Sequence, residues 1–258
     1  MKLSELLKII DTKKTKLDKF RPLSKEQINN LKNIYDIDLT FNSNAIEGST
    51  LTYSETKLIL NEGLTIGGKK MNEHLEVINH KDALDFIESI SHLKSNDIKI
   101  KDIKDIHYLI LKAISTSDAG KYRVKQVGVR KSDGTIYNFV EPLKVKDEMD
   151  DFILWLQTNK ENLHPVILSA VAHYKFVTIH PFIDGNGRTA RLLMNLILIQ
   201  NGYPPAVIKV SNRVEYIQAI EKAQNENILD DFYQVIAKAT NESLDTYLNI
   251  LENDITLI

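Results

Sequence analysis

Apolar residues recur along this chain mostly three or four positions apart, which is the spacing of an amphipathic α-helix. One such run extends from Leu168 to Ile179, with Pro165 near its first turn, where proline favours a helix start. A second, more uniformly apolar run covers Leu192 to Ile199. Asn201-Gly202 and then Pro204-Pro205 mark its end. The two runs predict an amphipathic helix followed by a more deeply buried one.

The helical pattern continues on both sides of this pair. Glu76 to Leu93 has helical spacing, as do positions 216, 220 and 223, and one or two further helices are expected between Phe232 and Leu251. We therefore expect an all-α protein. A soft boundary near Asn96 divides an N-terminal helical region, 1–96, from a core, 97–258.

One stretch departs from the helical pattern. Gln126 to Phe139 is rich in β-branched and aromatic residues and contains an Asp-Gly pair at positions 133 and 134. An Asp-Gly pair between two short extended runs is a hairpin signal. The sequence thus predicts a single short β-hairpin within a helical fold.

Composition excludes some functions. The 33 basic and 35 acidic residues of this 258-residue chain give a net charge of −2, which does not favour nucleic-acid binding through a positive field. The absence of cysteine excludes disulfides, thiolate metal sites and a cysteine nucleophile. There is no signal-peptide pattern, and Leu192 to Ile199 is too short to cross a bilayer. We expect a soluble, cytoplasmic protein that binds neither nucleic acid nor membrane.

The segment His180 to Arg191, between the two central helices, contains the densest group of chemically active residues. Gly185 and Gly187 flank an asparagine and permit successive backbone N–H groups to point inward as an anion nest. The nest leads into a helix N-terminus, whose free N–H groups and dipole favour a phosphate. The alternative is a simple turn, but the helix that follows argues against a hairpin here.

Charged side chains complete this segment. Arg188 and Arg191 lie three positions apart on one helix face, and their guanidinium groups suit phosphate oxygens. Asp184 is suited to ligate Mg²⁺, and His180 to accept a proton near neutral pH. Together they indicate phosphate chemistry.

The same segment matches the signature of the Fic family, H-P-F-x-(D/E)-G-N-G-R-x-x-R, at every defined position, and the chain resembles that family over roughly residues 40 to 245. The resemblance implies a helical bundle with a β-hairpin flap. It implies transfer of AMP from ATP, with Mg²⁺, to Ser, Thr or Tyr hydroxyls of a target protein and of the protein itself. Dimerisation is common in the family, so a homodimer is among the expected partners.

The resemblance also assigns roles to residues. His180 would be the general base, Asp184 would hold Mg²⁺, Arg188 would stabilise the leaving pyrophosphate, and Arg191 would meet the γ-phosphate. Phe182 would be buried and anchor the loop.

Further nucleotide contacts follow from the same resemblance. Gly185, Asn186 and Gly187 would cradle the phosphates, with Asn186 near the α-phosphate. Tyr216 matches a family position near the nucleotide base, and Gln224 stands where a human member has Asn.

The predicted hairpin fits the family's flap, which aligns the target by main-chain pairing. The candidate tip consists of Ser132, Asp133, Gly134, Thr135, Ile136, Tyr137 and Asn138.

A second motif, Ser43 to Gly48, resembles the family's inhibitory motif (S/T)-x-x-x-E-(G/N). Ser43 and Glu47 are four apart, on one face of a helical turn. The resemblance places them on an inhibitory helix near residues 35–48, with Glu47 paired to Arg191 where the γ-phosphate would bind. The chain thus resembles the class of the family that is inhibited by its own N-terminal helix.

Other functions remain open from the sequence. The same site would also suit removal of AMP from a modified protein, and a non-catalytic nucleotide-binding module is the non-enzymatic alternative. Kinase chemistry of the related Doc branch is disfavoured, because that branch departs from the Gly-Asn-Gly-Arg pattern. Gly63 to Lys70 nearly fits a P-loop but lacks its final hydroxyl, and we expect a glycine-rich turn there. His173 is expected on a helix surface or in a hydrogen bond rather than as a zinc ligand.

Overall fold

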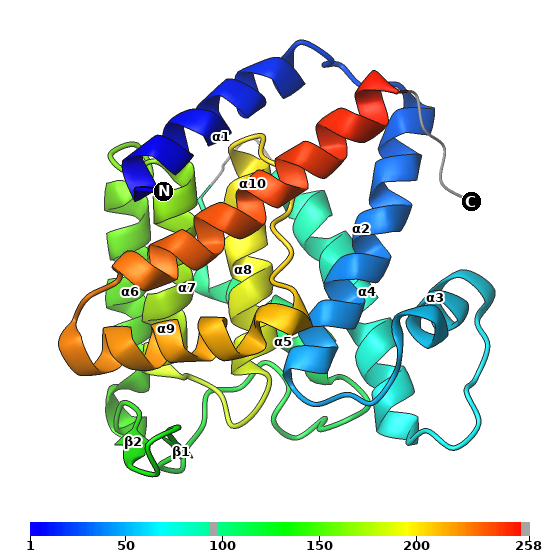
Figure 1. Ribbon diagram of the computed structural model, residues 1–258. Coiled ribbons are helices and arrows are strands. Elements are labelled where there is room, and N and C mark those ends of the chain that lie inside the picture. Colours follow the sequence, from blue (N-terminus) through cyan, green and yellow to red (C-terminus); the bar gives the residue numbers. More distant parts are fainter. Residues whose placement is uncertain (93–96, 254–258) are drawn as a thin grey trace.

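The computed structural model describes residues 1–92 and 97–253. Within them the chain forms ten α-helices, one antiparallel pair of strands and two short 3₁₀ turns (Figure 1). The elements are α1 (Leu3–Asp18), α2 (Lys25–Ile46), α3 (Tyr53–Glu62), α4 (Met71–Ser91), α5 (Ile100–Leu111), β1 (Gly128–Arg130), β2 (Ile136–Asn138), η1 (Pro142–Lys144), α6 (Val145–Asn159), α7 (Pro165–Ile179), α8 (Asn186–Gln200), η2 (Val210–Asn212), α9 (Arg213–Glu226) and α10 (Asp230–Glu252).

Helices α7 and α8 form the centre of the bundle, and both are apolar on more than one face. Leu192, Leu193 and Leu196 of α8 pack into one hydrophobic core, while Met194 and Leu198 pack into a second core on the other side. A helix that is apolar all round is covered on all sides. The predicted deep burial of this helix is confirmed.

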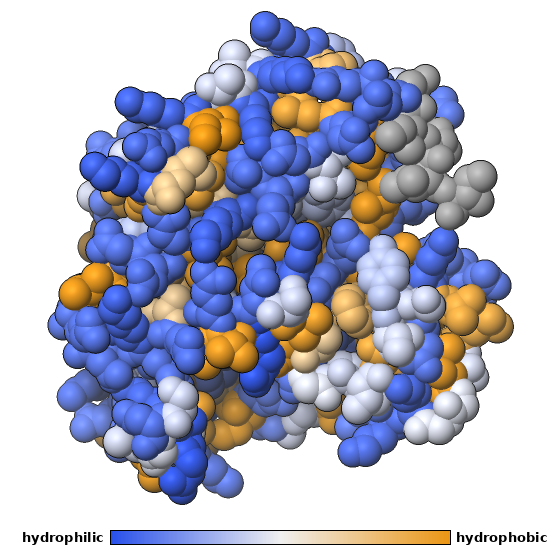
Figure 2. All heavy atoms as spheres, viewed as in Figure 1, coloured by the Kyte–Doolittle hydropathy of each residue, from blue (hydrophilic) through white to orange (hydrophobic). Residues whose placement is uncertain are grey.

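The remaining helices cover the two faces of this pair. Helices α4, α5 and α6 contribute to the first core. Helices α1, α9 and α10 contribute to the second, and α1 and α10 lie against each other across that side (Figure 1). The loop between α7 and α8, the end of α2 and the hairpin all lie toward the lower end of the molecule in this view. The face shown in Figure 2 is mostly hydrophilic, with apolar residues scattered over it.

The predicted fold class is confirmed: the chain is helical apart from one short hairpin. Its strands pair Gly128 with Asn138, Val129 with Tyr137 and Arg130 with Ile136. The turn lies at the Asp-Gly pair, as predicted, with Gly134 at φ +85°. Residues 230–252 form one helix rather than two.

Two further expectations concern the organisation of the chain. The domain boundary expected near Asn96 lies outside the described residues, as does Leu93, the expected end of a helix. The division into two parts stays a prediction, and α2 and α4 share the first core with α7 and α8. None of the helices described here combines the length and apolarity needed to span a membrane.

Candidate active site

The loop between α7 and α8 is held in shape by its own residues. His180 ends α7 in the left-handed region at φ +52°, and Gly185 precedes α8 at φ +73°. Phe182 is fully buried, as predicted. The side chain of Asn186 accepts a hydrogen bond from the Phe182 N–H at 3.0 Å and donates one to its carbonyl at 2.9 Å. Asn186 therefore fixes the loop that precedes the helix start.

A buried histidine on α5, His107, packs against the loop between α7 and α8. His107 stacks on the Phe182 ring, with centroids 3.6 Å apart and planes 5° apart. Its Nδ1 accepts a hydrogen bond from the Gly120 N–H at 2.9 Å, so its proton is on Nε2, which donates to the Asp184 carbonyl at 2.9 Å. Burial lowers the pKa of His107 to about 4, which keeps the ring neutral.

His180 is oriented for proton transfer. Its Nδ1 lies 3.3 Å from the Val177 carbonyl, so the proton belongs on Nδ1 and the Nε2 lone pair remains. Its ring stacks on Phe139, just after β2, at a centroid distance of 3.8 Å. Burial lowers the pKa of His180 to about 4, so the imidazole is an unprotonated acceptor at neutral pH.

Arg123 ties this histidine to the base of the hairpin. Its side chain is 5% exposed, and it donates to the carbonyls of His180 at 2.8 Å and of Lys125 at 3.0 Å. It also donates to the Val140 carbonyl, and its backbone N–H bonds to the Pro181 carbonyl at 2.9 Å. One buried guanidinium thus joins the end of α7 to both arms of the hairpin.

The two arginines of α8 have different acidic partners. Arg188 lies 3.3 Å from Glu76 of α4 and 3.8 Å from Asp184, and its Nε is buried without a hydrogen-bond partner in the described part of the chain. Asp184 is 71% exposed in its side chain, and its Oδ1 accepts a bond from the Gly185 N–H at 2.6 Å. Arg188 therefore has unused hydrogen-bonding capacity beside an exposed carboxylate.

Arg191 is bound to the end of α2. It donates to the Ser43 hydroxyl at 3.0 Å, to the Ser43 carbonyl at 2.9 Å and to Glu47 at 2.7 Å. A cation is favourable at this helix C-terminus, where backbone carbonyls lack intrahelical partners. The structure thus brings together Ser43, Glu47 and Arg191.

The Glu47 carboxylate lies directly over the start of α8. A Cβ atom added to Gly187 would stand 2.3 Å from Glu47 Oε1, far closer than atoms can approach. Burial on its own would raise the pKa of Glu47, but the charge and hydrogen bond of Arg191 outweigh it and lower the pKa. An anionic carboxylate therefore occupies the helix end that the sequence marks as an anion site.

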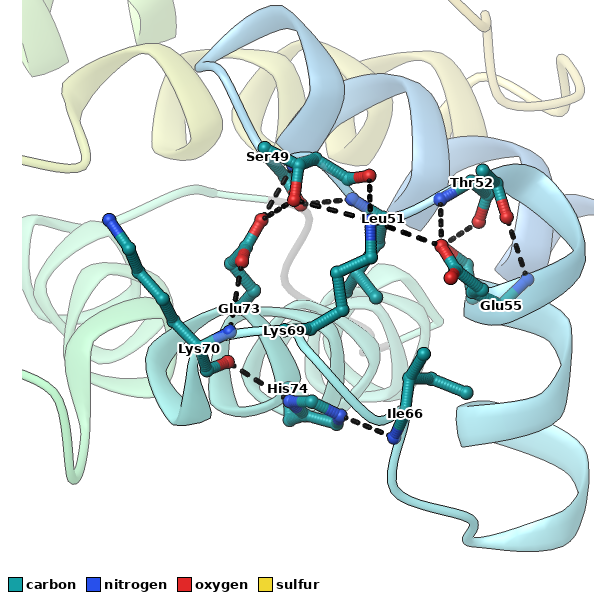
Figure 3. Close-up of polar contacts among 11 residues, drawn as sticks. Ser49, Leu51, Thr52, Glu55, Ile66, Lys69, Lys70, Glu73 and His74 are labelled. Atoms are coloured by element: carbon teal, nitrogen blue, oxygen red, sulfur yellow. Dashed lines mark hydrogen bonds and ion pairs between the residues drawn. The ribbon is translucent and has the colours of Figure 1, made fainter.

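The segment that follows Glu47 is anchored to the start of α4 (Figure 3). Glu73 accepts bonds from the Thr50 N–H at 2.6 Å and hydroxyl at 2.8 Å, and Lys69 donates to the Thr50 carbonyl at 2.6 Å. His74 accepts from the Ile66 N–H at 2.8 Å. Gly63 to Lys70 thus forms a hydrogen-bonded turn between two helices, as expected.

Tyr216 and Gln224 lie on α9. Tyr216 is 2% exposed, and its hydroxyl lies 2.8 Å from His173 and 3.5 Å from Arg191. His173 is hydrogen-bonded, as one expectation had it, but it is fully buried rather than on a surface. Gln224 is partly exposed on α9.

The hairpin is fixed at its tip. Ser132 donates its N–H to Glu221 of α9 at 2.9 Å, and Lys131 donates to Asn225 of the same helix. Its strands are otherwise exposed. The hairpin therefore has a defined position, with its base at His180 and its tip on α9.

A divalent cation would find only part of a coordination shell in the protein. Among residues 1–92 and 97–253, no group of three or more acidic or histidine side chains is placed to hold a metal. Asp184 is an exposed carboxylate beside the anion site, so it suits a hard cation whose other ligands are phosphate oxygens and water.

Several residues of this site were missed by the sequence analysis. They are Glu76, His107, Arg123 and Phe139. His107 follows Ile103 by four positions and precedes Leu111 by four, so the sequence spacing could have predicted that it lies on a buried helix face. Arg123 lies outside any helix or strand, and no local pattern indicates its role.

Comparison with known proteins agrees with this geometry. The Fic/DOC family model matches residues 97–198. "Protein adenylyltransferase Fic" of Nematostella vectensis is 38% identical over 245 residues, covering 95% of this chain and 56% of the relative. The protein of the same name from Drosophila melanogaster is 39% identical over 209 residues, covering 81% of this chain and 41% of that protein. The chain thus spans about half the length of the curated relatives it matches.

Solved structures share the whole fold. Fic-1 of C. elegans (residues 134–508) superposes with a TM-score of 0.85 at 31% identity, covering 98% of this chain and 74% of that one. A Fic-domain-containing signalling protein from Bacteroides thetaiotaomicron gives a TM-score of 0.90 at 26% identity, covering 97% and 99%. The chain belongs to the Fic/DOC family.

Proposed function

We propose that this protein transfers AMP from ATP to hydroxyl groups of a target protein and is restrained by its own Glu47. The observation that carries the proposal is a histidine, with Nδ1 directed at the Val177 carbonyl, at one end of a loop whose other end is a helix N-terminus that already accommodates an anion, the Glu47 carboxylate. The curated relatives are named protein adenylyltransferases, which supports the same reaction.

The reaction would proceed by direct displacement. Nε2 of His180 takes the proton of a Ser, Thr or Tyr hydroxyl of the target, and the oxygen attacks the α-phosphorus of ATP. The bond from that phosphorus to the bridging oxygen of the β-phosphate breaks, so pyrophosphate leaves with the bond's electron pair. The lowered pKa of His180 supports this role, because the acceptor form predominates at neutral pH.

The protein's other contributions are positioning and electrostatic stabilisation. The N–H groups at the start of α8 would bind phosphate oxygens, and the side chain of Asn186 keeps that loop in place. Arg188, whose Nε lacks a partner within the described residues, would donate to the departing pyrophosphate. Asp184 would hold Mg²⁺, which supplies charge neutralisation on the phosphates when bound.

The restraint follows from competition for the same atoms. Glu47 accepts from Arg191 and lies over Gly187, where terminal phosphate oxygens of ATP would bind. Nucleotide and carboxylate therefore exclude each other, and ATP binds productively only when the end of α2 moves away. The expected cytoplasmic location and homodimer stay predictions.

Labelled ATP tests the reaction. The Glu47→Gly protein, incubated with Mg²⁺ and a lysate, should retain label from α-labelled ATP and none from γ-labelled ATP. The His180→Ala, Glu47→Gly double variant should bind ATP and transfer nothing. Label retained only from the γ position would mean phosphoryl transfer instead. If a protein that binds ATP retained neither label, the proposal would be contradicted. Two functions would then remain, removal of AMP from a modified protein and nucleotide binding without catalysis. Release of AMP from a protein that already carries it would distinguish the first from the second.

A further inference from the structure

A cavity of about 700 Å³ lies beside α2, where this helix, α4 and the end of α8 come together with α10 (Figure 1). Helix α2 lines it with residues between 28 and 39, α4 with residues between 84 and 91, and α10 with Tyr247. Its volume is that of a site for a drug-sized molecule. Within the described part of the chain, no residue assigned above to the active site lines it, so it is a separate cavity.

The walls of this cavity combine aliphatic and aromatic surfaces. Leu31 of α2 and Ile87 of α4 belong to the aliphatic part. Tyr35 and Tyr247 form an aromatic part, with ring centroids 4.8 Å apart and planes at 61°. Burial raises the pKa of Tyr247, and the neighbouring Tyr35 and Glu88 add to the shift, so a carboxylate lies close to these rings. Aromatic faces and carboxylates both attract organic cations.

Acidic side chains outnumber basic ones beside the rings. Asp36 and Glu88 line the cavity, and Asp85 lies next to them. Lys32 lies 2.8 Å from Asp85 and 3.6 Å from Asp36, and it also pairs with Glu88. Lys81 lies 3.3 Å from Asp36 and 2.5 Å from Asp85. Two ammonium groups are therefore shared among three carboxylates.

This part of the wall favours a positive charge. Burial on its own would lower the pKa of Lys32, but hydrogen bonds to its acidic partners outweigh it and raise the pKa. Burial raises the pKa of Asp36 although the neighbouring lysines oppose the shift, so this carboxylate is not fully compensated. Arg21, the other wall residue with a permanent positive charge, pairs with Asp18 at 2.9 Å and adds no net charge.

Helix α2 connects the cavity with the restraint on the active site. Tyr35, Leu39, Ser43 and Glu47 follow one another at intervals of four positions, so they lie along one face of the helix. The first two line the cavity, and the last two accept hydrogen bonds from Arg191. A molecule that contacts α2, α4 and α8 together would stabilise the arrangement in which Glu47 covers the start of α8.

We propose that the cavity binds a small organic amine with a largely apolar body, and that this ligand holds α2 in its restraining position. The second part rests on the proposed function, because it concerns the restraint by Glu47. The apolar body lies against the aliphatic wall, and the ammonium group lies between the tyrosine rings and the Glu88 carboxylate. A ligand that carries a carboxylate instead would meet an excess of negative charge.

Three matched probes test the ligand chemistry. Naphthylmethylamine, naphthylmethanol and naphthoate share one aromatic body and carry a positive, a neutral and a negative group. Isothermal titration calorimetry with the native chain should show the amine binding about three- to tenfold more tightly than the alcohol, and the carboxylate binding most weakly.

Substitutions locate the binding site. Glu88→Gln should remove the advantage of the amine over the alcohol and leave binding of the alcohol unchanged. Glu26→Gln makes the same change at an exposed position of α2 that does not line the cavity, and it should alter neither affinity. Ile28→Trp, at a cavity residue that is 45% exposed, fills part of the space and should weaken binding of all three probes.

The affinity for ATP tests the link to Glu47. Saturating naphthylmethylamine should weaken binding of ATP to the native chain about fivefold or more, because it favours the arrangement in which Glu47 excludes the nucleotide. The Glu47→Gly protein should still bind the amine, and its affinity for ATP should not respond to it.

The outcomes separate the two proposals. Equal binding of the three probes, or binding of none, overturns the inference. An unchanged affinity of the native chain for ATP also overturns it, because the amine would then not act through α2. The same loss of ATP affinity in the Glu47→Gly protein overturns it as well, because the amine would then compete at the nucleotide site. These measurements need no transfer of AMP, so a Glu47→Gly protein that transfers no label overturns the proposed function separately.

Discussion

At position 187 a single methyl group would alter the site, because Glu47 Oε1 occupies the space where a Cβ would stand. Glycine at this position thus admits an oxygen atom, whether from a carboxylate or from a phosphate. The Glu47 carboxylate keeps 42% of its side-chain surface exposed, so solvent screens its attraction to Arg191. The contact between Glu47 and Arg191 therefore excludes a competing anion and can still open.

Glu47→Gly should raise AMP transfer at least about tenfold, since the substitution removes a charge-assisted hydrogen bond on the order of 1.5 kcal/mol or more. The measurement is the initial rate of label transfer from α-labelled ATP. Glu62→Gly makes the same chemical change at the exposed end of α3 and should leave the rate unaltered. An unchanged rate in a well-folded Glu47→Gly protein would remove Glu47 as the restraint.

At the scale of elements, Arg123 joins the end of α7 to the hairpin. Its guanidinium satisfies carbonyls at the end of α7 and on both arms of the hairpin. Buried carbonyls that lose their donor cost free energy, because water cannot reach them. The relation between His180 and the hairpin therefore depends on the Arg123 side chain together with the Phe139 ring, which stacks on His180.

Arg123→Met should lower the free energy of unfolding by more than about 2 kcal/mol, since several carbonyls lose their partner together. Arg130→Met is the matched control, because Arg130 is exposed and, among residues 1–92 and 97–253, donates a side-chain hydrogen bond only to the Gly134 carbonyl; it should cost less than about 0.5 kcal/mol. Urea unfolding followed by circular dichroism measures both. Equal losses of unfolding free energy in the two variants would show that the buried hydrogen bonds of Arg123 do not stabilise the fold.

The difference between local signals and contacts made by distant segments explains how far the sequence could predict the site. Helices α7 and α8, the loop between them and the hairpin carry local signals: apolar spacing, Pro165, and the Asp-Gly pair. The Glu47–Arg191 pair was predicted only through a family motif, since the two residues are 144 positions apart. Arg123 depends on contacts between segments that come together only in the folded chain.

At the scale of the whole molecule, the fold holds four histidines in neutral form, His80, His107, His173 and His180, of which His180 has its pKa lowered by burial to about 4 as described above. His80 and His173 have pKa values lowered to about 3, and His107 to about 4, in each case chiefly by burial. Each ordinarily has a pKa of 6.5, so the unfolded chain binds protons that the folded chain excludes. Their contribution to stability is present above pH 6.5 and is lost as the pH falls toward the folded values.

Acidification from pH 6.5 to 5 should therefore lower the free energy of unfolding by about 1 to 2 kcal/mol for each of these histidines. Most carboxylates titrate below this window, so histidines dominate it. Urea unfolding at several pH values gives the slope. His173→Gln should reduce the slope, while His92→Gln, at an exposed position, should not. A flat profile in the native chain would show that the rings are not buried as neutral groups.

Because the carboxylate that covers the start of α8 is covalently part of the same chain, under the proposed function it acts as a tethered competitor of ATP. Its local concentration is set by the geometry of α2 and cannot be diluted. Basal turnover per molecule should then be the same in dilute and concentrated solution. Only a contact that moves or holds this helix end, or enough nucleotide to outcompete it, would change the rate.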